Sequence, residues 1–141
     1  MSGLRGANAY ATVGLESGIL AASAYQRIIM LFDSYQAAIR IARLHMQAGD
    51  VAGKGRAITK AVNIVSRGLR GSLDKERGGE VAANLERLYD VVVRLLLRAS
   101  LHNDEEALNT AADVIENIAS AWRQIGPRVE EEGSHGASAG N

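Results

Sequence analysis

Several features of secreted and membrane proteins are missing from this chain of 141 residues. It has no cysteine, its start (MSGLRGANAY) lacks an apolar signal-peptide core, and no apolar run approaches the roughly 20 residues that span a bilayer. These absences argue against membrane insertion and predict a cytoplasmic protein. A secreted protein can also lack cysteine, so this expectation depends mainly on the missing signal peptide.

An excess of charge of one sign is missing as well. The 16 basic and 16 acidic residues cancel. Proteins that bind nucleic acid or anionic lipid mainly through charge carry a clear excess of lysine and arginine. We therefore expect no nucleic-acid partner.

Patterns typical of β-strands are also absent. The apolar residues recur instead at helical spacing, and glycines gather where this periodicity stops. Aromatic residues make up only 4% of the chain, and no useful stretch alternates apolar with polar residues. Four helices are predicted: about Ala24 to Gln47, Val51 to Leu73, Glu80 to the break at His102, and Asp104 to about Pro127, the only proline. Ser23 and Asp104 are expected to cap the first and the fourth helix.

Helices of about 22 residues are about 33 Å long, and short loops force neighbours to run antiparallel. The predicted fold is an all-α, antiparallel, up-down-up-down four-helix bundle with a short N-terminal helical segment or cap. We expect a flexible tail at 1–9, one bundle domain at 10–129 and a disordered acidic tail at 130–141. The predicted core consists of apolar residues at helical spacing: Ile28, Leu31, Phe32, Tyr35, Ile39, Ala42, Met46, Ile58, Val62, Val65, Leu69, Val81, Leu85, Leu88, Val92, Leu95, Ala99, Leu108, Ala111, Ile115, Ile118, Ala119, Trp122 and Ile125.

The first helix carries a second apolar stripe nearly opposite its core face. Met30, Ala37, Ile41 and Leu44 form it. Full burial of a side chain such as Met30, Ile41 or Leu44 contributes roughly 1.5–3 kcal/mol, so leaving all three in water forgoes a sizeable gain. We expect a partner, or another part of the chain, to cover this stripe.

Two further helices have unusual faces. On the second, Ala57, Ala61, Ile64, Gly68 and Gly71 form a stripe of mostly small residues, which indicates close approach of another backbone. That backbone belongs either to a neighbouring helix or to an incoming peptide. On the third, Tyr89, Val93, Leu96 and Leu97 widen the apolar arc, so this helix is either central or holds a partner, and only Asp90, Arg87, Arg94 and Arg98 mark its solvent face.

No pattern in the chain predicts catalysis, a cofactor or a metal. The segment from Gly49 to Gly55 has only a superficial likeness to a phosphate loop, because its glycine spacing is wrong and it lacks the Ser or Thr that ligates magnesium. The single Glu-x-x-His pair, Glu132 and His135, falls in the predicted tail, whereas a di-iron bundle needs two such pairs and further carboxylates. We expect a protein without enzymatic activity.

Short segments along most of the chain have the order and spacing of one known family. They are Ala9-Tyr10, Glu16-Ser17, Ala22-Ser23, Met30-Leu31-Phe32-Asp33, Gly53-Lys54-Gly55, Lys60-Ala61, Ile64, Gly68-Leu69, Ser72-Leu73-Asp74, Asn84-Leu85, Leu88-Tyr89, Asn103-Asp104 and Ala121-Trp122. From about Ala9 to Ile125 the chain resembles the flagellin-specific export chaperones of the FliS family. It departs from the family at Ser34, among other positions, where the family often has glycine.

The resemblance implies a cytoplasmic helical bundle that holds the disordered C-terminal segment of flagellin, blocks premature filament assembly and delivers flagellin to the flagellar type III export gate. It also implies that Tyr10 acts as a movable plug over part of the client site. The client contacts we expect lie on the leftover faces of the first, second and third helices: Met30, Ala37, Ile41, Leu44, Ala57, Ala61, Ile64, Gly68, Tyr89, Val93 and Leu97. The alternative is a self-associating adaptor that buries the same stripes in a homodimer.

Overall fold

The computed structural model describes residues 18–138, with side chains described for residues 24–126. This part of the chain forms helices α2 (Gly18–Ala48), α3 (Val51–Asn63), α4 (Lys75–His102) and α5 (Glu105–Ser138). A π-helical segment, η2 (Ile64–Leu69), and a 3₁₀ turn, η3 (Arg70–Ser72), continue α3. No strand occurs within the described range. Tyr10 and the predicted N-terminal cap lie outside it.

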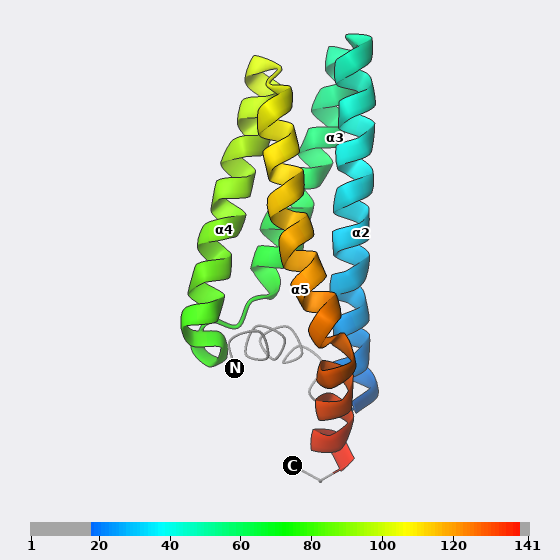
Figure 1. The fold of residues 1–141 in the computed structure, drawn as a ribbon, viewed down its shortest axis with the longest axis vertical. Helices are drawn as coiled ribbons and strands as arrows, with labels where there is room; N and C mark the ends of the chain where they lie inside the picture. The colour runs from blue at the N-terminus through cyan, green and yellow to red at the C-terminus, as the bar shows by residue number, and fades with distance from the viewer. Residues whose placement is uncertain (1–17, 139–141) are drawn as a thin grey trace.

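The helices follow one another around an up-down-up-down bundle (Figure 1). α2 packs most extensively on α5 and α3, whereas α4 packs on α5 and on α3 with its continuation η2. α2 and α4 are therefore diagonal to each other, and short joints link antiparallel neighbours. The predicted all-α four-helix bundle is confirmed. Among the described residues, no helix combines the length and apolar content that a bilayer span requires.

The end of α2 and the start of α3 follow from two consecutive residues, Gly49 and Asp50. Gly49, with φ of 73°, ends α2 in a left-handed conformation that glycine adopts without strain. Asp50 then caps α3, because its carboxylate accepts a hydrogen bond from the Gly53 N–H at 2.9 Å. This hydrogen bond also holds the pKa of Asp50 below its usual value. At its other end α2 begins at Gly18, so the prediction that Ser23 caps it was wrong: Ser23 lies inside the helix.

The start of α4 has a sharp kink. Asp74 caps its first turn by accepting a hydrogen bond from the Arg77 N–H, and Gly79 then adopts a non-helical backbone conformation with φ of 54°. The straight part of α4 therefore begins at about Glu80, as predicted. Its far end stops at Asn103, which has φ of 51°.

Asp104 caps α5, as the sequence predicts, by accepting a hydrogen bond from the Ala107 N–H at 3.0 Å. That hydrogen bond, with one from Arg98, lowers the pKa of Asp104. α5 does not end at Pro127, where the sequence predicts its end. Its helical backbone continues to Ser138.

Most of the predicted core is buried, and the largest fully buried side chains are Tyr35, Tyr89, Phe32, Ile39, Ile58, Leu69, Leu96, Leu108, Ile115, Val65 and Val92. The third helix is the exception, because its buried face is rotated from the predicted one. Leu88, predicted as core, is 41% exposed, whereas its neighbour Tyr89 is fully buried. The buried positions of α4 are Gly78, Ala82, Tyr89, Val92, Leu96 and Ala99. Several other predicted core residues, among them Val62 and Leu85, are only partly buried against the core.

A candidate client-binding face on α2 and α3

The second apolar stripe of α2 is uncovered. Met30, Ile41 and Leu44 are 65%, 47% and 66% exposed, and Ala37 between them is half-buried. None of the described residues packs over these side chains closely enough to bury them. The first helix thus buries one apolar face in the bundle and leaves a second in solvent.

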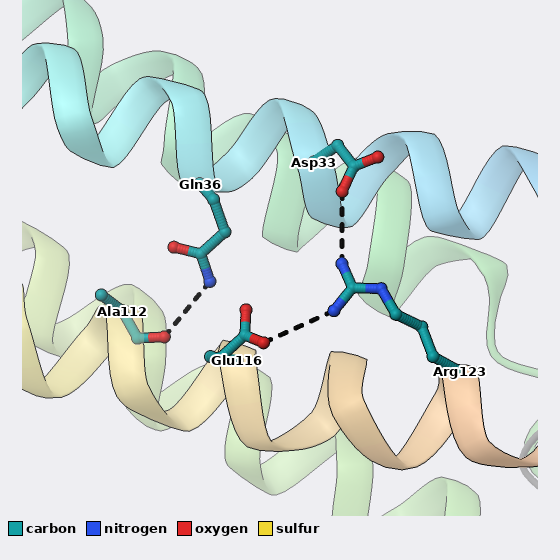
Figure 2. A network of polar contacts seen from close by, with 5 residues as sticks. All are labelled: Asp33, Gln36, Ala112, Glu116 and Arg123. Carbon is teal, nitrogen blue, oxygen red and sulfur yellow. Dashed lines mark hydrogen bonds and ion pairs between the residues drawn. The ribbon is translucent and has the colours of Figure 1, made fainter.

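Polar contacts close the flank of this stripe that faces α5 (Figure 2). Asp33 of α2 pairs with Arg123 of α5 at 3.2 Å, and Arg123 also contacts Glu116 at 3.4 Å. One turn along, the Gln36 side-chain amide donates a hydrogen bond to the Ala112 carbonyl at 3.3 Å. We call this row the α2–α5 seam.

The seam continues to the far end of α2. The Arg43 guanidinium donates to the Asn109 side chain at 2.7 Å, and Gln47 donates to Glu105 at 3.4 Å. Polar contacts between α2 and α5 therefore run along this flank of the stripe.

The opposite flank, toward α3, is apolar and hollowed. A groove of about 320 Å³ lies beside Met30 and Leu31 and extends to Ser34 and Ser72. Gly68 of η2 lies close to Leu31: a Cβ atom at Gly68 would be 3.0 Å from the Leu31 Cδ2 atom. The missing side chain at Gly68 lets the two helices approach closely. We call Met30, Ala37, Ile41, Leu44, Ile64, Gly68 and the groove the α2–α3 face.

Ser34, where the chain departs from the glycine common in the family it resembles, is exposed and lines this groove. Ile64 on the opposite side is half-buried. Apart from Arg27, small and apolar side chains of α2 line the groove, and Ser72 of η3 borders it on the other side.

Comparison with known proteins identifies the family of this chain. The family model described as "Flagellar protein FliS" matches residues 6–129. A flagellar secretion chaperone FliS of Salmonella typhimurium is 48% identical over 124 residues, covering 88% of this chain and 92% of the relative. One from Escherichia coli is 43% identical, covering 88% and 91%. A more distant relative from Pseudomonas aeruginosa, a flagellar secretion chaperone FliSB, is 32% identical, covering 89% and 98%.

The chain belongs to the FliS family. One segment on which the resemblance to this family rests, Gly53-Lys54-Gly55, has a structural role at the end of the bundle. Lys54 is only 5% exposed, and its ammonium donates a hydrogen bond to the Asn103 side chain at 3.1 Å. A Cβ atom at Gly53 would lie 2.5 Å from the His45 Nδ1 atom, so a larger residue there would have to displace the His45 side chain. The segment joins the α2–α3 turn to the α4–α5 turn and is not a phosphate loop.

Three of the predicted client contacts are core residues in this FliS-family bundle. Ala57, Ala61 and Tyr89 are 7%, 0% and 0% exposed. The small side chains of Ala57 and Ala61 admit a neighbouring helix of the same bundle, so the prediction that they contact a client was wrong. Tyr89 was assigned to the client face because apolar residues cover most of α4, and the sequence therefore did not show which of them face the core.

The remaining predicted contact residues divide between two faces. Val93 is half-buried and Leu97 is exposed, both on α4, which is diagonal to α2. α4 exposes further apolar side chains that the sequence analysis did not select, Val91 and Leu101. Leu101 directly precedes the polar end of α4, where a single apolar residue does not reveal a helical periodicity.

Among the described residues, no group of three or more histidine, aspartate or glutamate side chains is placed to hold a metal ion. The carboxylates with lowered pKa serve local structure. Glu86, for example, accepts a hydrogen bond from Lys75 at 2.8 Å and also pairs with Arg70, and these contacts lower its pKa.

Proposed function

We propose that this chain is a cytoplasmic flagellar secretion chaperone that holds the C-terminal segment of flagellin on the α2–α3 face. The observation that carries the proposal is the uncovered stripe of Met30, Ile41 and Leu44, which adjoins an apolar groove in a bundle of the FliS family. The names of the relatives support the secretion role. The polar seam leads us to place the client on the α3 side of the stripe and not on the α5 side.

The α2–α3 face suits a segment that is disordered before it binds. Because the three side chains are already partly buried, each gains only part of the roughly 1.5–3 kcal/mol that full burial contributes, and this gain offsets part of the entropy that the client loses on ordering. The client would fold as an amphipathic helix or extended piece along the groove. While its C-terminal segment is held there, flagellin cannot use that segment for filament contacts, which prevents premature polymerisation.

Delivery follows from reversible binding. The chaperone carries flagellin to the flagellar type III export gate and releases it there, without catalysis, a metal or a cofactor. Tyr10 is proposed, from the family resemblance, to cover part of the client site in the free protein and to move aside when flagellin binds.

Calorimetric titration with the isolated C-terminal segment of flagellin from the same cell tests this proposal. We expect tight binding, a large negative heat-capacity change and a gain of helicity measured by circular dichroism. The titration is repeated with residues 1–9 removed and with Tyr10→Ala, which should strengthen binding if the N-terminal segment competes with the client. Absence of binding by every form would contradict the proposal and favour the self-associating adaptor, which sedimentation would then reveal as a tight homodimer.

A further inference from the structure

A row of arginines runs along the outer face of α4. Arg87, Arg94 and Arg98 are exposed, and their spacing of seven and then four residues places them on one side of the helix. The rise of 1.5 Å per residue separates them by about 10.5 Å and about 6 Å along the axis.

Apolar side chains flank the arginine row on both sides. By the helical period, Leu88 and Val91 lie on one side of it, and Leu97 and Leu101 lie on the other. All four are exposed, Leu101 by 78%. An open hollow of about 480 Å³ joins Val91, Leu97 and Leu101 to Arg94 and Arg98. We call the three arginines and these four apolar residues the α4 arginine face.

One of the three positive charges on this face is paired with a carboxylate within the described residues, and the other two are not. Arg98 pairs with Asp104 at 2.9 Å, and Arg87 contacts only the neutral Asn84 side chain. Arg94 has no hydrogen-bond or ion-pair partner within the described part of the chain. Two acidic residues of α4 lie close to the row in sequence: Asp90 pairs with Arg70 of η3 at 2.9 Å, and Glu86 pairs with Arg70 and Lys75.

We infer that the α4 arginine face docks an amphipathic helical segment of a second protein, one whose carboxylates lie in a row between apolar side chains. Charge complementarity selects such a segment, because arginine recognises carboxylates in pairs of hydrogen bonds and the flanking leucines and valine bury apolar surface. An antiparallel partner helix would present its carboxylates at positions i, i+4 and i+11.

An anionic membrane fits this face less well. Helices that lie in a membrane surface separate an apolar face from a basic face, whereas here the arginines stand between the two apolar rows and would have to enter the hydrocarbon with them. The site is also separate from the α2–α3 face. α4 packs on α5 and α3 rather than on α2, so both faces can be occupied at once (Figure 1).

The test uses a labelled synthetic helical peptide of about 18 residues, with glutamates at i, i+4 and i+11 between leucines, and a matched peptide with lysines at those positions. Fluorescence anisotropy with the full chain should show binding of the glutamate peptide. Arg94→Glu should weaken this binding at least about tenfold, and the lysine peptide should bind the Arg94→Glu protein better than it binds the wild type. The control Arg56→Glu makes the same change of charge on α3 and should have no such effect.

Two results would overturn the inference: no binding of the glutamate peptide to the wild type, or equal weakening by Arg56→Glu. If the peptide does not bind while phosphatidylglycerol-containing vesicles bind in a way that requires Arg94, the face contacts a membrane instead. Ile41→Asp should leave peptide binding unchanged. Failure of flagellin binding and failure of this second site are thereby distinguished.

Discussion

The two flanks of α2 differ in how they meet their neighbours. Toward α5, the seam from Asp33–Arg123 to Gln47–Glu105 fills the boundary with polar contacts. Toward α3, Gly68 and Leu31 meet closely, and beside them the groove and the exposed Met30 remain open. Exposed apolar area alone therefore does not define a binding face. We therefore place the proposed binding face where exposed apolar area continues into the groove beside Met30.

The two flanks of α2 can be compared only while the bundle stays folded, and the bundle core should tolerate no charge. Val65→Asp should cost about 3–5 kcal/mol of unfolding free energy, because Val65 is fully buried and the introduced aspartate carboxylate would have no partner there. Urea unfolding followed by circular dichroism measures this loss. Val62→Asp is the matched control from the same helical region: Val62 is only partly buried, so its loss should be clearly smaller. Equal losses would show that the two positions do not differ in burial.

The α2–α5 flank also depends on close packing at Gly126. A Cβ atom there would overlap the Tyr25 ring, which stacks on Trp122 with ring centroids 5.3 Å apart. Both rings are buried, so neither moves away cheaply. Gly126→Ala should therefore cost about 1–3 kcal/mol in urea unfolding, despite the better helix propensity of alanine. A stabilised variant would mean that Tyr25 rearranges freely, and the matched change Gly55→Ala, where no atom lies within 4 Å, controls for propensity.

A buried hydrogen bond on the same flank should give a smaller, pH-dependent effect. The Tyr35 hydroxyl donates to the Ala111 carbonyl at 2.9 Å, and burial raises the pKa of Tyr35 well above its usual value. Tyr35→Phe should cost about 1 kcal/mol near neutral pH.

The sign of the pH dependence follows from the raised pKa. In the unfolded chain Tyr35 ionises near pH 10, whereas in the folded protein it stays protonated, so wild-type stability falls as the pH rises above about 10. The phenylalanine variant lacks this contribution, and the difference in unfolding free energy between the two proteins should shrink above pH 10. A constant difference from pH 7 to 11 would contradict the assignment.

The smallest effect is expected in the exposed part of the seam. Arg123→Ala removes the contacts to Asp33 and Glu116, and exposed ion pairs of this kind contribute less than about 1 kcal/mol. The variant should lose little stability and bind the flagellin segment as the wild type does. A strong loss of binding in calorimetry would mean that the client crosses the seam, and the two flanks would no longer differ in function.

Regular periodicity made much of the fold predictable from sequence. Phe32, Tyr35 and Ile39 recur at helical spacing and are buried, and Asp104 is an N-cap in both the sequence and the structure. The π-helical segment was not predicted, because one extra residue in a turn leaves no mark on composition. The structure shows it by a hydrogen bond from the Arg70 N–H to the Val65 carbonyl, five residues back.

The candidate site was predictable only in part. The exposure of Met30, Ile41 and Leu44 was predictable because they lie opposite a well-defined core stripe. Their contact with a client stays a prediction. Ala57 and Ala61 were misassigned, because small residues mark close approach without saying whose backbone approaches. Lys54 was missed because a charged residue in a glycine-rich turn is usually solvated, and its burial depends on Asn103, which is distant in the sequence.

The most direct test of the α2–α3 face is Ile41→Asp, measured for unfolding free energy and for binding of the C-terminal flagellin segment in the same preparation. Thr110→Asp on the exposed surface of α5 serves as the control for an added charge. We expect Ile41→Asp to fold with nearly wild-type stability and to lose flagellin binding, while Thr110→Asp retains both. An Ile41→Asp protein that folds and binds flagellin normally would contradict the assignment of this face to the client.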